Sequence, residues 1–486
     1  MAVHDLVLRD VRIFDGEGNA PVEGDVAISS GRFAMVGDAG SGTVEIDGRG
    51  RAVAPGFVDV HTHDDGALLT HPGLEFKVAQ GCTSVVVGNC GFSATPPLDQ
   101  ALLGLVSPPW TDLNGYLALV DGSAVNVMSQ VGHNTARQHV MGNEQRRPTR
   151  NELNRMTFFV ESAMQQGACG FTTGLVYEPG RYSATDEIIE LAKPCGERGG
   201  IYNSHMRNEG DQLLQSVDEL IRIGDEAGCG CHISHHKAGG QRNWGRVTDS
   251  LNQVDHANAG GADITLDVYP YTAGSGPTYQ YFDLDDVDLE LAACIRIAAS
   301  SDFPEFSGRR LIDISDETGE PLEDLLVRII TAPGRERTIG IQFTMSEVDV
   351  ESNLRHPLVM IGSDGIPDLR GAPHPRLFGT FPRVLGHYVR ERGVLDLGEA
   401  IRKMTSLASD RFGLVGRGRI VVGGHADLVM FDPATVIDTA TYDDPMTAPI
   451  GIDLVVVNGE IAFRDGVHTY VRSGRALRYR SADRTR

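Results

Sequence analysis

Apolar residues along this chain form short runs, which are separated by longer segments with helical spacing. Eight of these runs are predicted to be buried strands, at residues 53–61, 83–90, 125–132, 168–174, 200–205, 229–235, 263–269 and 358–364. The amphipathic segments between them are typical of repeated βα units with a parallel sheet. Because eight such strands close a barrel, the pattern predicts an α/β fold, a (β/α)8 TIM-like barrel.

One connecting helix has a clear predicted beginning and end. Thr149 and Glu152 form a Thr-x-x-Glu capping box directly before the segment LNRMTFFVESAMQQ, and Gly167 follows that segment. The helix comes after the third predicted strand. We therefore expect it on the outside of the barrel.

The pattern of apolar and polar residues at the two ends of the chain differs from the pattern in the middle. Residues 1–55 and 415–486 contain short β-branched runs broken by Gly and Asp, which predicts one small β-sandwich domain built from both ends. Residues 56–414 then form the barrel. About residues 276–350 form an insertion between strands seven and eight, longer than a βα connection needs, and are a candidate lid. Its acidic run DLDDVDLE is interpreted as a solvated helix face rather than a cation site.

Composition excludes several classes of partner. The 486 residues carry 43 Lys and Arg against 66 Asp and Glu, a formal charge of −23, whereas nucleic acids and anionic membranes need a basic surface. The apolar runs are shorter than a membrane span requires, and the residues MAVHDLVLRD do not predict a secretory signal. Seven scattered cysteines favour reduced thiols. These features predict a cytoplasmic enzyme with a small-molecule partner, and they leave its oligomeric state open.

Residue types that bind metals stand at the ends of six predicted strands. In the run Val-Asp-Val-His-Thr-His, His61 and His63 point to the same side of the chain because strand side chains alternate. The other four strand ends carry Cys90, His205, His235 and Asp364. The carboxyl ends of barrel strands converge on one mouth, so we expect all six to surround one point. Nitrogen, sulfur and carboxylate ligands predict a catalytic Zn²⁺ site.

Other residues of metal-binding type receive a structural interpretation. A strand would turn His236 toward the helical layer, so it is expected to pack or to support a ligand. Cys82, Cys229 and Cys231 are expected to be inert thiols. His133 and His139 have no partner at a useful spacing, and they receive no role.

Asp364 is the candidate general base and acid. A carboxylate beside a zinc ion can accept a proton from water and pass it to a departing nitrogen. The alternative for Asp364 is the N-cap of a helix, which the sequence GSDGIPD also permits.

Together these motifs resemble the amidohydrolase superfamily, and within it the N-acyl-D-amino-acid deacylases, or D-aminoacylases. The resemblance covers nearly the whole chain. It is carried by the motifs APGFVDVHTHDD, GCTSVVVGNCGFS, GLVYEPG, SHMRNEG, ISHHK, DVYPYTAGSG, IGSDG, HPRLFGTFPRVLG and GRIVVGGHADLVMFD. Many members of the superfamily use a carboxylated lysine on strand four. Here that strand reads GFTTGL, which fits the deacylase pattern, in which the strand-two cysteine takes its place.

The resemblance implies a role for each candidate residue. Cys90, His205 and His235 would hold one zinc tightly. His61, His63 and Asp364 would form a second position, weaker or empty, with Asp364 also serving as catalytic acid and base. The residues implied for substrate binding are Lys237 and Arg376 for the carboxylate, and Tyr177, Tyr269 and Ser275 for the pocket. For Lys237 and Arg376 the alternative is a surface salt bridge.

The function that the resemblance implies is zinc-dependent hydrolysis of the amide bond of an N-acyl-D-amino acid. Two alternatives stay open: a cyclic amide or D-dipeptide hydrolase on the same barrel, and a scaffold without activity. The D preference comes from the resemblance alone. The acidity of the insertion disfavours N-acyl-D-glutamate and N-acyl-D-aspartate as substrates.

Overall fold

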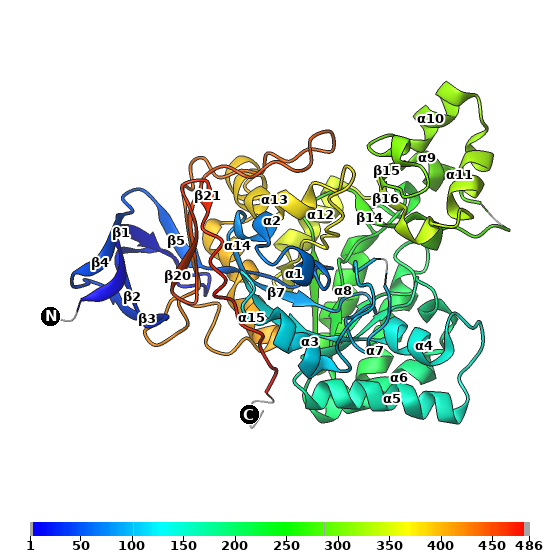
Figure 1. Ribbon diagram of the computed structural model, residues 1–486, viewed down its shortest axis with the longest axis horizontal. Coiled ribbons are helices and arrows are strands. Elements are labelled where there is room, and N and C mark those ends of the chain that lie inside the picture. The colour runs from blue at the N-terminus through cyan, green and yellow to red at the C-terminus, as the bar shows by residue number, and fades with distance from the viewer. Residues whose placement is uncertain (1–2, 101, 286, 481–486) are drawn as a thin grey trace.

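The computed structural model describes residues 3–100, 102–285 and 287–480 (Figure 1). Its strands are β1 (His4–Ile13), β2 (Val22–Ser29), β3 (Arg32–Gly37), β4 (Gly42–Asp47), β5 (Ala52–Pro55), β6 (Phe57–Asp59), β7 (Cys82–Val87), β8 (Asn126–Ser129), β9 (Val131–Gly132), β10 (Gly170–Gly174), β11 (Ile201–His205), β12 (Gly230–Ile233), β13 (Ile264–Val268), β14 (Gly274–Pro277), β15 (Ile295–Ala299), β16 (Ile339–Gln342), β17 (Val359–Ile361), β18 (Leu428–Phe431), β19 (Ile452–Val457), β20 (Glu460–Arg464) and β21 (Val467–His468).

Its α-helices are α1 (Ala67–Thr70), α2 (Glu75–Val78), α3 (Leu113–Val120), α4 (His133–Met141), α5 (Arg150–Gln165), α6 (Thr185–Glu197), α7 (Leu213–Ala227), α8 (Arg246–Ala259), α9 (Leu289–Ala293), α10 (Leu311–Thr318), α11 (Leu322–Ile330), α12 (Glu347–Arg355), α13 (Arg376–Arg383), α14 (Leu397–Met404) and α15 (Ser406–Phe412). The other helical turns are η1 (Gly180–Tyr182), η2 (Gln241–Asn243), η3 (Thr278–Tyr281), η4 (Pro304–Phe306), η5 (Arg335–Arg337) and η6 (Val384–Glu391). Among the described residues, no helix combines the length and apolar character that a membrane crossing requires.

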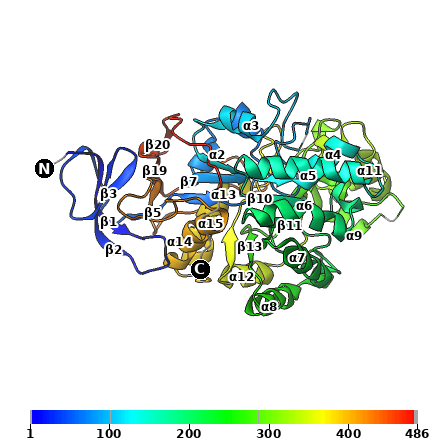
Figure 2. The ribbon, with the colours of Figure 1, turned by 90° about the horizontal axis from the view of Figure 1, so that it is seen from below.

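The centre of the molecule is built from parallel strands in two sheets. One has the order β6-β7-β8, and the other has the order β17-β13-β12-β11-β10-β9. Only Gln130 separates β8 from β9, and a parallel bridge joins Thr62 after β6 to Gly365 after β17. The two sheets therefore adjoin at both edges. Helices α4 to α8 lie outside the strands in Figure 2.

The first predicted strand is divided between two sheets. β5 pairs with β1 and β18, whereas β6 pairs with β7, and Gly56 stands between them. A Cβ atom at Gly56 would lie 2.2 Å from the side chain of Thr83, so this close approach requires glycine. The other seven predicted runs correspond to strands, and the run at 125–132 is broken at Gln130 into β8 and β9. The capping box of Thr149 and Glu152 is confirmed at the start of α5.

Strands from both ends of the chain share one nine-stranded sheet, at the left of Figure 1. Its order is β21-β20-β19-β18-β5-β1-β2-β3, with β4 added beside β1. Alternate residues of these strands form an apolar cluster that includes Leu8, Val26, Val53, Leu428 and Val456. Because β5 lies between β1 and β18, this sheet forms only when the two ends of the chain meet.

Between β13 and β17 the chain forms a separate lobe, at the upper right of Figure 1. The antiparallel strands β14, β16 and β15 carry helices α9 to α11, which pack around their own apolar cluster. The acidic run 283–290 is exposed, as expected, apart from half-buried Val287 and residue 286, which is outside the described part. The helix expected over this acidic run is α9, which begins only at Leu289 and therefore covers less of the run than predicted. Most of the run precedes α9, and Asp288 caps that helix by accepting a hydrogen bond from the backbone of Leu291.

Candidate metal centre

All six predicted ligand-type residues lie together at the carboxyl ends of the parallel strands. His61 and His63 follow β6, Cys90 follows β7, His205 ends β11, His235 follows β12 and Asp364 follows β17. The donor atoms of His61, His63, Cys90 and Asp364 lie within 4.8 Å of one another, and so do those of Cys90, His205 and His235. Cys90 belongs to both groups, so the arrangement is two adjoining sets of donors that share one sulfur.

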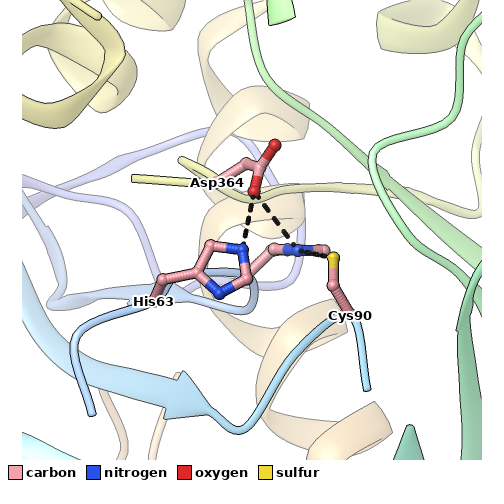
Figure 3. A group of neighbouring side chains, drawn as sticks. His63, Cys90 and Asp364 are labelled. Carbon is pink, nitrogen blue, oxygen red and sulfur yellow. Dashed lines mark hydrogen bonds and ion pairs between the residues drawn. The ribbon is translucent and has the colours of Figure 1, made fainter. Parts of the chain in front are cut away.

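The contacts within this centre are short and buried. The Cys90 Sγ atom lies 3.3 Å from His61 Nε2 and 3.3 Å from His235 Nε2. Asp364 Oδ1 lies 3.2 Å from His63 Nε2 and 3.5 Å from His61 Nε2. In Figure 3 the carboxylate of Asp364 points toward His63, with Cys90 close by. Convergent imidazole nitrogens, one sulfur and one carboxylate make a donor set that suits zinc.

Three of the six residues have left-handed backbone conformations. The φ angles are 53° at Cys90, 34° at His235 and 49° at Asp364. Residues other than glycine seldom adopt positive φ, and such strain concentrates at functional sites. All three residues stand two or three positions beyond the end of their strands, at the mouth of the barrel. Asp364 precedes no helix for eleven residues, so the alternative that it is an N-cap is wrong.

A buried carboxylate that the sequence analysis missed, Asp267 of β13, supports this centre. Its Oδ2 atom lies 3.1 Å from His61 Nδ1 and 2.9 Å from His232 Nε2, and its Oδ1 atom accepts from the backbone of His235. Burial opposes ionisation, yet His61 holds the pKa of Asp267 well below its usual range. A carboxylate that accepts a hydrogen bond from one ring nitrogen of a histidine fixes the ring and leaves the other nitrogen free to bind a metal. In His61 these two atoms are Nδ1 and Nε2, respectively. Strand alternation in DVYPY could have identified it as an inward residue.

A second missed residue, Lys77 of α2, joins the strand ends that carry His61 and Asp364. Its ammonium group is fully buried, and it lies 2.6 Å from Asp59 Oδ2, 3.0 Å from Thr62 Oγ1 and 2.8 Å from Ser363 Oγ. These partners are 15 to 286 residues away along the chain. No local pattern in the sequence indicates this network.

Replacing Lys77 by methionine should destabilise the fold by about 3–5 kcal/mol, because it leaves the Asp59 carboxylate buried without a counter-charge. Denaturant unfolding measures this loss. Lys193→Met is the control, since its ion pair with Glu190 is nearly half exposed and should be worth about 0–1 kcal/mol. Equal small losses in both variants would contradict a structural role for Lys77.

Arg376 is the candidate substrate residue nearest to the centre. It is fully buried, so the alternative of a surface salt bridge is wrong for it. Its Nη2 atom lies 2.9 Å from Asp364 Oδ2 and donates to the carbonyl of Ser275 at 3.1 Å. The guanidinium lies over the ring of Tyr269, 4.5 Å from its centroid. Its Nε and Nη1 atoms are buried and have no hydrogen-bond partner among the described residues.

The other candidate substrate residues line the same mouth. Lys237 Nζ lies 5.7 Å from the Tyr269 ring centroid and 2.8 Å from both carboxylate oxygens of Glu209, a residue that the sequence analysis missed. Tyr177 packs edge-on against His205 at 4.6 Å, and its hydroxyl lies 2.9 Å from that of Tyr281 in the insertion. The insertion therefore contributes to the wall of the site.

Among the described residues, the remaining histidines and cysteines singled out in the sequence belong to neither donor group. His236 Nδ1 lies 2.7 Å from Asn353 and its Nε2 lies 2.8 Å from Ser250, so it faces the helical layer as predicted. Cys82, Cys229 and Cys231 are free thiols, as are the other four cysteines. His133 is buried against Glu187 at 3.1 Å.

This chain is similar to known amidohydrolases over nearly its whole length. A model described as Amidohydrolase family matches residues 44–304 and 323–463. D-aminoacylase of Alcaligenes xylosoxydans xylosoxydans is 41% identical over 486 residues, 97% of this chain and 97% of the relative. N-acyl-D-glutamate deacylase of the same organism is 40% identical over 485 residues, 98% of this chain and 96% of the relative.

Solved structures give the same result. The crystal structure of N-acyl-D-glutamate deacylase from Bordetella bronchiseptica, in complex with zinc and a phosphonate inhibitor, is 38% identical with a TM-score of 0.90. The alignment covers 98% of this chain and 100% of that chain. The fold is thus that of the deacylase, a barrel of the TIM type with an additional domain. This chain belongs to the amidohydrolase family, in the group of the N-acyl-D-amino-acid deacylases.

Proposed function

We propose that this protein is a zinc-dependent enzyme that hydrolyses the amide bond of N-acyl-D-amino acids to a carboxylate and a free D-amino acid. The observation that carries the proposal is the pair of donor groups that share Cys90, with Asp364 placed between the histidines and the buried Arg376. Full-length similarity to two deacylases, at 40% and 41% identity, gives the class of substrate.

Six residues would hold zinc. Cys90, His205 and His235 form the tight position, and His61, His63 and Asp364 form a second, weaker one. The buried Nδ1 atoms of His63 and His205 have no hydrogen-bond partner among the described residues, whereas the Nε2 atoms lie 3.2 Å from Asp364 and 3.3 Å from Glu209, respectively. When bound, zinc supplies a Lewis acid that favours the attack of water on a carbonyl carbon.

Asp364 moves the proton in this reaction. Its Oδ1 atom, beside the histidines, accepts a proton from the attacking water and returns it to the amine nitrogen as that nitrogen leaves. Its Oδ2 atom is held by Arg376 Nη2, which fixes the plane of the carboxylate. Burial opposes ionisation of Asp364, but the charge of Arg376 holds its pKa well below the usual range, so the resting side chain is an ionised carboxylate.

Arg376 binds the carboxylate that every N-acyl amino acid carries, through its free Nε and Nη1 atoms. Hydantoins and other cyclic amides lack this carboxylate, so Arg376 favours open-chain acids over cyclic amides. Lys237 is the second predicted carboxylate ligand, with Tyr177, Tyr269 and Ser275 as pocket residues. The ammonium group of Lys237 already forms an ion pair with Glu209. It therefore offers little net positive charge to an acidic side chain of the substrate, and we expect neutral side chains to be preferred.

Replacing Arg376 by alanine should raise KM for N-acetyl-D-leucine about 10–100-fold, because hydrogen bonds to charged groups contribute about 1.5–3 kcal/mol. For the corresponding carboxamide, which has no anion, the change should be much smaller. Steady-state kinetics on the acid and the amide measure this difference. Arg222→Ala, which removes an exposed ion pair with Glu226, is the control. An equal rise in KM for acid and amide would contradict carboxylate binding by Arg376.

We also propose that the two parallel sheets act as one eight-stranded barrel at residues 56–414, with residues 276–350 as its insertion. The single-residue gap at Gln130 and the bridge between Thr62 and Gly365 support this division. For residues 1–55 and 415–486, of which 1–2 and 481–486 lie outside the described part, we propose a small sandwich domain, and the separate apolar cluster of its strands supports this. The last described residues lie against the barrel instead, because Ala476 forms a parallel bridge with Val127 of β8. The acidic charge and the free thiols favour a cytoplasmic enzyme.

The test of the proposed function is a turnover screen with the zinc-loaded protein. N-acetylated D- and L-amino acids are compared, with release of the free amine as the readout. We expect hydrolysis of the D series, with N-acetyl-D-leucine ahead of N-acetyl-D-glutamate. Turnover of the L series alone would overturn the assigned stereochemistry, and no turnover of either would overturn the function.

A further inference from the structure

Glu209 is one carboxylate shared by three side chains of the centre. Its Oε1 atom lies 3.0 Å from His235 Nδ1 and 2.8 Å from Lys237 Nζ, and its Oε2 atom lies 3.3 Å from His205 Nε2 and 2.8 Å from Lys237 Nζ. The side chain is 15% exposed. Two of its partners are histidines of the tight zinc position.

The backbone of Glu209 is also fixed. It lies in the loop between β11 and α7, and its carbonyl accepts a hydrogen bond from the backbone of Gly239 at 2.7 Å. Gly239 belongs to the loop after β12, which carries His235 and Lys237. Asn208 braces the other side, because its Oδ1 atom accepts from the backbone of Gly210. Glu209 therefore connects the loop that follows His205 with the loop that carries His235.

The two neighbours of His235 Nδ1 favour opposite tautomers. Lys237 Nζ lies 2.7 Å from this nitrogen, and an ammonium can only donate, so it favours an unprotonated Nδ1 with the proton on Nε2. Glu209 can only accept, so it favours a proton on Nδ1 and a free lone pair on Nε2. His235 Nε2 is the atom that faces Cys90 Sγ at 3.3 Å. Only the tautomer that Glu209 favours can bind a metal there.

We propose that Glu209 is a positioning residue that selects the metal-binding tautomer of His235 and restrains His205 beside it. It does so by accepting a hydrogen bond from the Nδ1–H group of His235, which keeps its proton, and by accepting the hydrogen bonds that the ammonium group of Lys237 donates. This inference rests on the zinc site of the proposed function. The competing explanation is that Glu209 serves only as the counter-ion of Lys237.

The test measures zinc affinity of the full-length protein by competition with a chromogenic chelator. Glu209→Gln and the double variant Glu209→Met with Lys237→Met should each bind the tightest zinc about 10–100-fold more weakly, the usual cost of removing an outer partner of a ligand. The double variant removes both charges together, which protects the fold from an unpaired buried ammonium. Thermal unfolding of the zinc-free proteins verifies folding.

Two single variants serve as controls. Lys237→Met keeps Glu209, so the zinc affinity of this variant should stay within about threefold of that of the wild type. This change is much smaller than the loss of about 10–100-fold expected when the outer partner of a ligand is removed. Glu219→Gln removes a carboxylate of matched exposure, 14%, that pairs with Arg207 outside the centre, and it should also leave zinc affinity unchanged. Kinetics are not needed for this readout.

Each outcome decides between the explanations. Weak zinc binding by both Glu209 variants supports the positioning role. Recovery of wild-type affinity in the double variant overturns it, because Glu209 would then matter only as the counter-ion of Lys237. Unchanged affinity in Glu209→Gln also overturns it. If the wild-type protein binds no zinc at all, the proposed function fails, which is distinguishable from failure of the Glu209 inference alone.

Discussion

Replacing Asp364 by asparagine is expected to lower kcat for N-acetyl-D-leucine about 10²–10⁴-fold, the usual contribution of a general acid and base. Asparagine keeps the size of the side chain and an oxygen that can face the histidines, but it cannot accept and return a proton. Because Asp364 touches His63, His61 and Arg376 at once, the loss should fall on kcat rather than on KM. Steady-state kinetics at equal zinc content measure it.

The control for this variant is Asp410→Asn. Asp410 forms an ion pair with Arg419 on the surface, where its side chain is 61% exposed, so kcat should not change. A loss of kcat for Asp364→Asn that disappears when zinc content is restored would show that Asp364 acts only as a ligand. In that case another group must move the proton.

Replacing Cys90 by alanine should have the second largest effect, because this sulfur belongs to both donor groups. Loss of an outer partner weakens metal binding about 10–100-fold, so loss of a ligand shared by two positions should exceed about 100-fold. When zinc is limiting, the turnover rate should fall in proportion to the fraction of protein that holds zinc. The measurements are zinc stoichiometry after dialysis and turnover over a range of added zinc.

Cys195→Ala is the matched variant. Cys195 is also a buried free thiol, but it lies in α6 and contacts the carbonyl of Ile201, away from the donors. This substitution should cost stability and leave zinc binding intact. One zinc held with wild-type affinity by Cys90→Ala would contradict the shared sulfur, and it would indicate that His61, His63 and Asp364 form the tight position.

The sequence alone determined the features that depend on local chain geometry. Strand alternation with period two placed His61 and His63 on one side and turned His236 outward, because both follow from the direction of successive side chains. The capping box of Thr149 and Glu152 involves atoms three residues apart. The six ligand-type residues could be found because each stands directly after an apolar run, at the end of a strand.

The tertiary structure decided which charges compensate one another. Asp267 is 206 residues from His61, Ser363 is 286 residues from Lys77, and Glu209 meets Lys237 only because β11 and β12 are neighbours. The division of the first strand at Gly56 likewise required contact with Thr83. These residues become partners because the sheets close and because buried charges must be paired. Sheet closure and charge pairing join residues that are far apart in the chain, so they produce no periodic pattern in the sequence. The clustering of the six ligand-type residues could therefore be predicted from the sequence. Strand alternation could also indicate that Asp267 points inward, but the partners of Asp267, Glu209 and Lys77 could not be predicted.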